Sequence, residues 1–326
     1  MGNQPFYHLR PNKQIDRSLF VQTLIGLKRF LPMEAYRYTG FGSYLFDDFK
    51  TLHDTLNICS MVSLERDKNE YERAKFNLPY NCIEIKNTDS TEYLSTLSLE
   101  DDSHNIFWLD YVKPDELGIQ LADYATLLNL LNPKDIVRIT LNANPGGLGS
   151  SNNPDELHSQ RLKVLKTRVP DEYCPISISP IDVTSRNYPL TLLKVLKKIT
   201  MQSLTDEAPY SPNFMMPLFS DIYADGQQML TFTGIVLDSH EMEEDIRNAL
   251  AGYPHNTFSW EDPNRIEVPA LSVREITEIN KLLPDLAVRQ QLIEKYQFIF
   301  SERDGQAVDS YISYYKYYPN YHQVSF

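Results

Sequence analysis

Apolar residues in the first half of the chain follow two alternating spacings. Short, nearly continuous apolar runs are typical of strands that are buried on both faces, and the stretches between them place apolar residues on one face of a helix. Strands joined by helical crossovers of a dozen or more residues predict a parallel sheet with helices on its faces. The predicted strands cover residues 34–39, 58–65, 82–86, 106–111 and 136–142. The predicted helices cover residues 6–30, 45–56, 67–76 and 117–131.

The pattern changes after Ala143. A loop-like stretch leads into predicted helices, and Asp225-Gly226 then separates two β-rich runs, which is a hairpin signal. The helices are expected at 155–167, 190–204, 272–283 and 286–300, the hairpin strands at 215–223 and 228–237, and an aromatic segment at 311–326.

Five parallel strands, a helix and then a hairpin is the order of elements in a class I methyltransferase sheet. We therefore predict an α/β fold with a Rossmann-like class I methyltransferase sheet, in which an antiparallel hairpin joins the parallel strands and helices are added at both termini. The expected division is a helical segment at 1–32, the α/β domain at 33–240 and an α-rich extension at 241–326.

Composition narrows the functional classes. The formal net charge of −13 disfavours nonspecific binding to nucleic-acid phosphates. The cysteines Cys59, Cys82 and Cys174 form no CxxC pair, so neither a disulfide framework nor a metal site is expected. With no apolar signal core near Met1 and no apolar run long enough to span a bilayer, we expect a soluble cytoplasmic protein without membrane partners.

Ligands of open α/β sheets bind outside the carboxyl ends of the strands. Gly40 and Gly42 end the first strand, and Ser43 follows them. Glycine lets the backbone approach a ligand closely, although an ordinary tight turn also needs it. Glu65 ends the second strand, where an acid can accept hydrogen bonds from two ribose hydroxyls. The alternative is a solvated glutamate at the start of a charged helix.

Three further strand ends carry polar candidates. Asp89, after the third strand, belongs to a polar turn that could reach an adenine amino group or serve only as a turn. Asp110 ends the fourth strand beside Tyr111 and is the candidate general base, or else orients the bound ligand. Asn142 ends the fifth strand, before a glycine-rich loop that is either a lid or a plain surface loop.

The N-terminal helix begins with basic residues. Arg10, Lys13 and Arg17 could clamp a phosphate or carboxylate, with Lys13 and Arg17 one helical turn apart. A solvated helix start is the other interpretation. We predict that any such anion is part of the substrate, and that Tyr111 and Asn142 also contact the substrate.

Several of these segments resemble a bacterial group of O-methyltransferase-like proteins. The resemblance implies a fold that binds S-adenosylmethionine (SAM), and we expect SAM as the cofactor, bound by Gly40, Gly42, Ser43, Glu65, Asp89 and Asp110. It covers about the first 150 residues and is weaker beyond them. The resembling segments are Arg10-Pro-Asn-Lys13-Gln-Ile-Asp-Arg17, Tyr38-Thr-Gly-Phe-Gly-Ser43, Ser63-Leu-Glu65, Trp108-Leu-Asp-Tyr111 and Thr140-Leu-Asn-Ala-Asn-Pro145.

Two positions depart from the usual methyltransferase glycine loop. Tyr38 stands where an acid normally meets the methionine amino group of SAM, and Tyr44 occupies the third glycine position. A [DNS]-Pro-Pro-[YFW] motif is also absent, so methylation of DNA-base amino groups is not supported.

Two hypotheses remain at this stage. The first is methyl transfer from SAM to an oxygen or nitrogen nucleophile of a small molecule or protein, favoured by Glu65 and Asp110. The second is a catalytically degenerate methyltransferase-fold module that acts through protein partners, for example in a bacterial defence complex, favoured by Tyr38 and Tyr44. The aromatic segment 311–326 either covers the chain's own core or joins subunits or partners.

Overall fold

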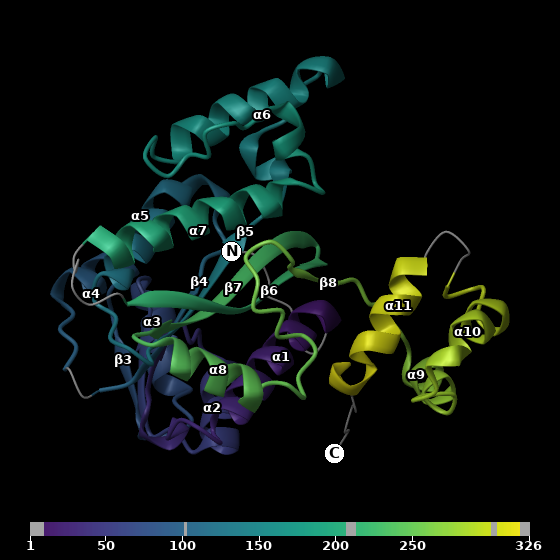
Figure 1. Ribbon diagram of the computed structural model, residues 1–326, viewed down its shortest axis with the longest axis horizontal. Helices are drawn as coiled ribbons and strands as arrows, with labels where there is room; N and C mark the ends of the chain where they lie inside the picture. The colour runs from purple at the N-terminus through teal and green to yellow at the C-terminus, as the bar shows by residue number, and fades with distance from the viewer. Residues whose placement is uncertain (1–9, 101–102, 207–212, 301–304, 320–326) are drawn as a thin grey trace.

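The computed structural model describes residues 10–100, 103–206, 213–300 and 305–319. One sheet runs through the molecule, with helices on both of its faces (Figure 1). The strand order is β3-β2-β1-β4-β5-β7-β6-β8. Strands β1 to β5 are parallel, β7 is antiparallel to both β5 and β6, and β8 is parallel to β6. The strands are β1 Arg37–Gly40, β2 Ser60–Leu64, β3 Ile83–Lys86, β4 Asn105–Asp110, β5 Ile136–Asn142, β6 Phe214–Asp225, β7 Gln227–Leu237 and β8 Asn264–Ile266.

Successive side chains along the central strands point to opposite faces of the sheet, so a separate hydrophobic core forms on each face. On β4, Ile106 and Trp108 belong to one core, and Phe107 and Leu109 belong to the other. The first core is covered by α1 Pro11–Leu27, α2 Asp47–Leu56, α3 Lys68–Phe76 and α8 His240–Ala249. The second is covered by α4 Ser90–Thr96, α5 Leu117–Leu128 and α7 Tyr188–Asp206, with α6 Pro154–Arg168 packed beyond α7 (Figure 1).

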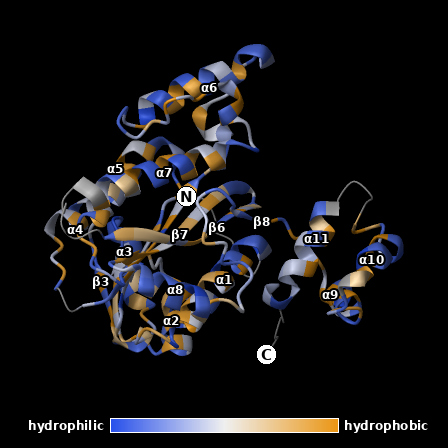
Figure 2. Cartoon of the chain, in the orientation of Figure 1, coloured by the Kyte–Doolittle hydropathy of each residue, from blue (hydrophilic) through white to orange (hydrophobic). Residues whose placement is uncertain are grey.

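The C-terminal helices extend the first core beside β8 and α1. They are α9 Val273–Asn280, α10 Arg289–Lys295 and α11 Gly305–Tyr314. Ile279, Leu292 and Val308 of these helices are buried in this core, and Figure 2 shows hydrophilic positions in blue along the same helices. Tyr311 and Tyr318 are buried, and the Tyr318 hydroxyl lies 2.9 Å from both Pro269 O and Leu271 N. The described part of the aromatic segment therefore covers the chain's own core, while residues 320–326 lie outside the described residues.

The predicted fold class is confirmed, and the differences concern short elements. The sequence pattern missed α4, α8, β8 and α11. Ser239 accepts a hydrogen bond from Met242 N and begins α8, a capping signal that the apolar pattern alone does not contain. The three residues of β8 form a strand because they pair with β6, so the expected α-rich extension also contributes to the sheet.

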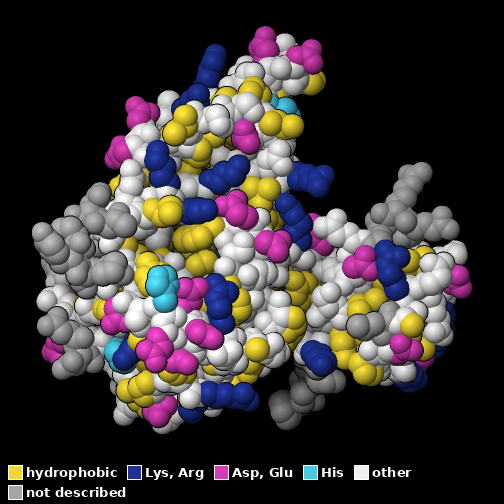
Figure 3. Space-filling view, viewed as in Figure 1, with side chains coloured by type: hydrophobic (Ala, Val, Ile, Leu, Met, Phe, Trp, Pro, Cys, Tyr) yellow, Lys and Arg dark blue, Asp and Glu magenta, His cyan; other side chains and the backbone are white. Residues whose placement is uncertain are grey.

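Charge is distributed unevenly over the surface. On the face seen in Figure 3, Lys and Arg side chains gather over α6 and α7, and acidic side chains cluster over α8. None of the helices in the described ranges is long and apolar enough to cross a membrane.

A buried ion pair fixes α1 across the sheet. Arg138 of β5 is completely buried, and its Nη2 lies 2.5 Å from Asp16 Oδ1 of α1. Thr231 and Thr233 of β7 complete the hydrogen bonding, donating to Asp16 and accepting from Arg138. The guanidinium also lies 4.7 Å from the Trp108 ring centroid, where the electron-rich face attracts a cation.

A second carboxyl group adjoins this pair. Asp221 of β6 is fully buried, and burial together with the neighbouring Asp16 carboxylate raises its pKa well above the ordinary value. The raised pKa favours the protonated, neutral form of Asp221 beside the Asp16 carboxylate. Asn264 Nδ2 donates to Asp221 Oδ1 over 2.9 Å.

We expect Asp16→Asn to lower the free energy of unfolding by about 3–5 kcal/mol, because Arg138 would keep a buried charge without its counterion. Asp221→Asn should cost about 1 kcal/mol or less, because an amide of the same shape is neutral, like the protonated Asp221, and can still accept from Asn264. Urea unfolding at pH 7, followed by circular dichroism, measures both values. Equal losses would contradict this assignment of charges.

The raised pKa of Asp221 also predicts that the stability of the protein depends on pH. Because the folded-state pKa of Asp221 is raised, its favourable contribution is complete below the unfolded pKa near 3.8 and is lost as the pH rises through the folded value. The stability of the wild type relative to Asp221→Asn should therefore fall with rising pH.

Candidate functional site

The carboxyl ends of β1, β2 and β4 meet at one edge of the sheet. Gly40 is paired with Ser63 on one side and with Trp108 on the other. Glu65 and Asp110 each lie two residues beyond these partners, so the fold places the predicted acids on either side of the glycine turn.

The glycines of this turn are required by the chain's own packing. A Cβ atom on Gly42 would lie 2.5 Å from Ser63 Oγ, to which the Gly42 amide donates over 3.2 Å. A Cβ atom on Gly40 would lie 2.7 Å from the Tyr38 hydroxyl. Ser43, next in the turn, has a φ of 47°. Packing alone accounts for both glycines, and their contact with a cofactor stays a prediction.

The two tyrosines that replace family-typical residues have different surroundings. Tyr38 is buried with its ring edge-on to Phe49, and burial, followed by the charge of Asp48, raises its pKa far enough to keep it neutral. Tyr44 stacks under the Arg73 guanidinium, 3.4 Å from ring centroid to Cζ.

Glu65 and Asp89 occupy neighbouring loops. Glu65 is half-buried, accepts a hydrogen bond from Asp67 N over 3.1 Å, and has a pKa raised by burial. Asn87 Nδ2 donates to Glu65 O and so joins the loops after β2 and β3. Asp89 caps α4 by accepting from Glu92 N over 2.9 Å, which gives it a structural role in the turn.

Asp110 is paired with the N-terminal helix. Its Oδ2 lies 3.2 Å from Lys13 Nζ, and the backbone N of Lys13 donates to Asp225 at the hairpin tip. Asp110 Oδ1 is buried and has no hydrogen-bond partner among the described residues. Burial opposes ionisation of Asp110, but Lys13 and Arg17 outweigh it and lower the pKa. Asp110 is therefore a stable carboxylate with one oxygen left to accept.

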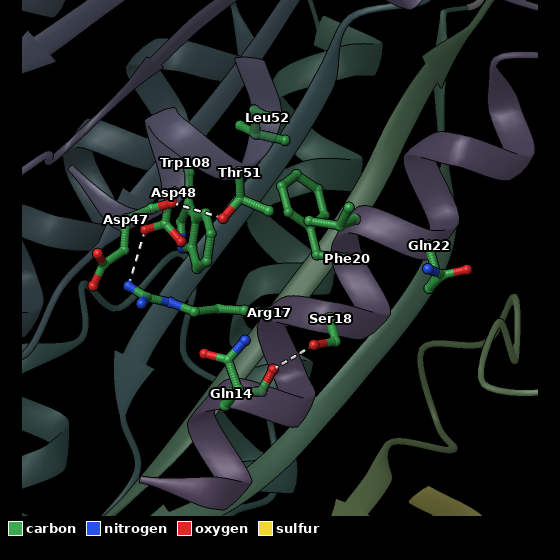
Figure 4. A pocket seen from close by; sticks show the side chains of 11 residues that line it. Gln14, Arg17, Ser18, Phe20, Gln22, Asp47, Asp48, Thr51, Leu52 and Trp108 are labelled. Carbon is green, nitrogen blue, oxygen red and sulfur yellow. Dashed lines mark hydrogen bonds and ion pairs between the residues drawn. The ribbon is translucent and has the colours of Figure 1, made fainter. Parts of the chain in front are cut away.

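A second ion pair lies beside the first. Arg17 Nη2 is 2.9 Å from Asp48 Oδ2 at the start of α2, and both side chains are largely buried. Burial raises the pKa of Asp48 despite Arg17. The two residues border a cavity of about 130 Å³ between α1 and α2, with Trp108 at its wall (Figure 4). Sequence reasoning missed Asp48, although Asp47-Asp48 directly after the glycine turn was an available signal.

Three other predicted residues are not brought into this cluster. The Tyr111 hydroxyl donates to Asp123 over 2.7 Å, and the side chain belongs to the opposite core. Asn142 donates to Val112 O and accepts from Asn144 N, which ties together the loops after β4 and β5. Arg10 is partly buried and precedes α1. Within the described ranges, no group of three or more His, Cys, Asp or Glu side chains is arranged to hold a metal ion.

Gly42→Ala should lower the free energy of unfolding by about 1–3 kcal/mol, because the new methyl group overlaps Ser63 Oγ. Adding Ser63→Gly should recover part of the loss. Gly252→Ala is the matched control, since nothing lies within 4 Å of the Cβ position there. Thermal melts of the three variants test the packing role, and an unchanged melt for Gly42→Ala would disprove it.

One family profile and several solved structures are similar to this chain. The sequence profile described as putative O-methyltransferase matches residues 5–326. Among solved structures, the N-methyltransferase NodS from Bradyrhizobium japonicum is 10% identical, with 68% of this chain and 97% of that chain covered and a TM-score of 0.38.

Two further solved structures have a similar, low likeness. A putative O-methyltransferase from Klebsiella pneumoniae is 12% identical over 72% of this chain and 91% of that chain, with a TM-score of 0.36. The O-methyltransferase from Bacillus cereus in complex with SAH is 12% identical over 68% and 80%, also with a TM-score of 0.36. No curated protein matches the sequence. The structural scores are too low to support an argument, so the assignment rests on the profile match: the chain belongs to the putative O-methyltransferase family.

Proposed function

We propose that the protein binds SAM at the edge formed by β1, β2 and β4 and transfers its methyl group to an oxygen nucleophile. The family assignment and the strand order support this reaction class. SAM supplies the chemistry when bound, because its sulfonium makes the attached methyl group electrophilic. The protein's part is to bind, orient and exclude water.

The observation that carries the proposal is the unpartnered Asp110 Oδ1. A buried carboxylate oxygen without a donor costs about 1–3 kcal/mol, so a ligand that donates to it would recover this energy. The amino-acid end of SAM carries an ammonium and a carboxylate. Asp110 offers an acceptor to the first, and Lys13 and Arg17 carry the charge that attracts the second.

This arrangement would replace the acid that Tyr38 lacks. Asp110 and Asp48 are both close enough to Tyr38 to raise its pKa, so their charges surround the position where the usual carboxylate would lie. We infer that the ammonium-binding role has moved from β1 to Asp110 at the end of β4.

Glu65 would hold the ribose at the other end of the ligand. Its Oε1 accepts the backbone N–H of Asp67, and Asn87 of the loop after β3 donates to its backbone carbonyl. Burial raises the pKa of Glu65. Hydrogen bonds that a ligand donates to its carboxylate would lower this pKa and offset the effect of burial.

Proton transfer from the acceptor suits Asp110 poorly. A lowered pKa makes a carboxylate a weak base, and Lys13 already neutralises its charge. Our proposal therefore gives Asp110 an anchoring role in place of the general-base role expected from its sequence position. Asp48 has a raised pKa and lines the cavity, which makes it the better candidate to accept a proton.

Calorimetry with two ligands separates the two ends of the site. Asp110→Asn should weaken SAM binding at least ~10-fold, since one charged hydrogen bond is worth about 1.5–3 kcal/mol, and leave 5′-methylthioadenosine, which lacks the amino-acid end, unaffected. Glu65→Gln should weaken both ligands. The exposed Glu72→Gln on α3 is the control and should change neither.

Failure of SAM and S-adenosylhomocysteine to bind folded wild-type protein at millimolar concentration would contradict the proposal. That outcome would favour the alternative hypothesis of a degenerate module that acts through partners.

A further inference from the structure

A second reactive cluster lies away from the proposed ligand site, at the amino ends of β2 and β3. Cys59 immediately precedes β2, and Cys82 immediately precedes β3. Their sulfur atoms lie 3.7 Å and 3.9 Å from the same atom, Nδ1 of His53, near the end of α2. Cys59 is exposed and Cys82 is partly buried.

The strand register brings the two cysteines within bridging range. Met61 pairs with Ile83, and Met61 N donates to Cys82 O over 3.1 Å. Cys59 and Cys82 are therefore diagonal neighbours on adjacent parallel chains, with Cα atoms roughly 6 Å apart for a strand spacing of about 4.8 Å and a rise of about 3.3 Å. Disulfides span Cα separations of about 4.4–6.8 Å. Since both sulfurs also contact one imidazole nitrogen, they lie on the same side of the sheet.

One ring nitrogen of the histidine between the thiols can be identified as the protonated one. His53 Nδ1 lies 3.0 Å from the carbonyl oxygen of Ile58, which can only accept, so Nδ1 carries the proton. The two sulfurs lie 3.7 Å and 3.9 Å from this nitrogen, and the Cys59 thiol also donates to Asn57 O over 3.4 Å. Burial raises the pKa of the Cys82 thiol and keeps it protonated.

We propose that Cys59 and Cys82 form a reversible disulfide when the protein meets a peroxide. The Cys59 thiolate attacks hydrogen peroxide, its sulfur is oxidised to sulfenic acid, and the peroxide O–O bond breaks to release hydroxide. The Cys82 sulfur then attacks the sulfenic sulfur, forming the S–S bond and releasing water. Two thiols and one hydrogen peroxide thus give one disulfide and two waters, and a dithiol reductant reverses the change.

The consequence is a covalent tie at one end of the sheet. β3 is the edge strand and has only β2 as a neighbour in the sheet. A bridge from Cys59 to Cys82 would close the chain around α3 and restrain β3 in the unfolded ensemble. The oxidised protein should therefore melt at a higher temperature than the reduced protein.

The test treats full-length protein with a small excess of hydrogen peroxide and identifies products by intact mass and peptide mapping. We expect an intramolecular Cys59–Cys82 bridge, a mass loss of about 2 Da, and full reversal by dithiothreitol. Cys59→Ser and Cys82→Ser should each abolish the bridge, and Cys82→Ser should accumulate a sulfenic acid at Cys59 that dimedone traps. Cys174→Ser is the matched control and should oxidise like the wild type.

His53→Ala tests the part played by the imidazole. The bridge should still form, because the strand register that brings Cys59 and Cys82 within bridging range does not depend on the His53 side chain. A bridge that includes Cys174, a bridge between two molecules, or wild-type Cys59 that passes directly to sulfinic acid would overturn the proposal. Since no measurement uses SAM, these results are independent of the methyltransferase proposal.

Discussion

The ion pair between Asp16 and Arg138 fixes the N-terminal helix on the sheet, and the candidate site depends on that helix. Lys13 lies one turn before Asp16 and Arg17 directly after it, so anchoring Asp16 positions the two cations at Asp110 and Asp48. The pKa of the adjacent Asp221 is raised by burial and by Asp16, and its neutral form adds no second negative charge beside Asp16. Arg138 also helps to lower the pKa of Asp110, so the structural pair and the ligand-facing carboxylate are linked electrostatically.

This arrangement explains how the protein can keep a ligand site while departing from the usual glycine loop. Tyr38 occupies buried space on β1 and remains neutral, so β1 contributes no carboxylate to this edge of the sheet. Negative charge comes from Asp110 and Asp48, and positive charge comes from α1. The proposed site is assembled from three separate elements and would need α1 in place before the ligand binds, so we expect the buried pair to matter for binding as well as for stability.

Local patterns predicted the parallel strands, the hairpin and the acids at the strand ends, because periodicity and strand-end position are properties of short segments. The charged partners of these residues could not be predicted from local patterns. Asp48 and Asp16 acquire their roles only through contacts with residues far along the chain. One signal was available: Arg138 interrupts the apolar run of β5, and a charge in a strand buried on both faces requires a counterion. Tyr111 and Asn142 have suitable chemistry at strand ends, but their side chains join loops and core.

A crystal structure of the protein with S-adenosylhomocysteine tests the central claim most directly. The account predicts that the ligand's ammonium lies within hydrogen-bond distance of Asp110 Oδ1, its carboxylate beside Lys13 and Arg17, and its ribose hydroxyls at Glu65, with α1 still held by Arg138. A ligand whose amino-acid end lies away from α1, or whose ammonium meets a group other than Asp110, would contradict it.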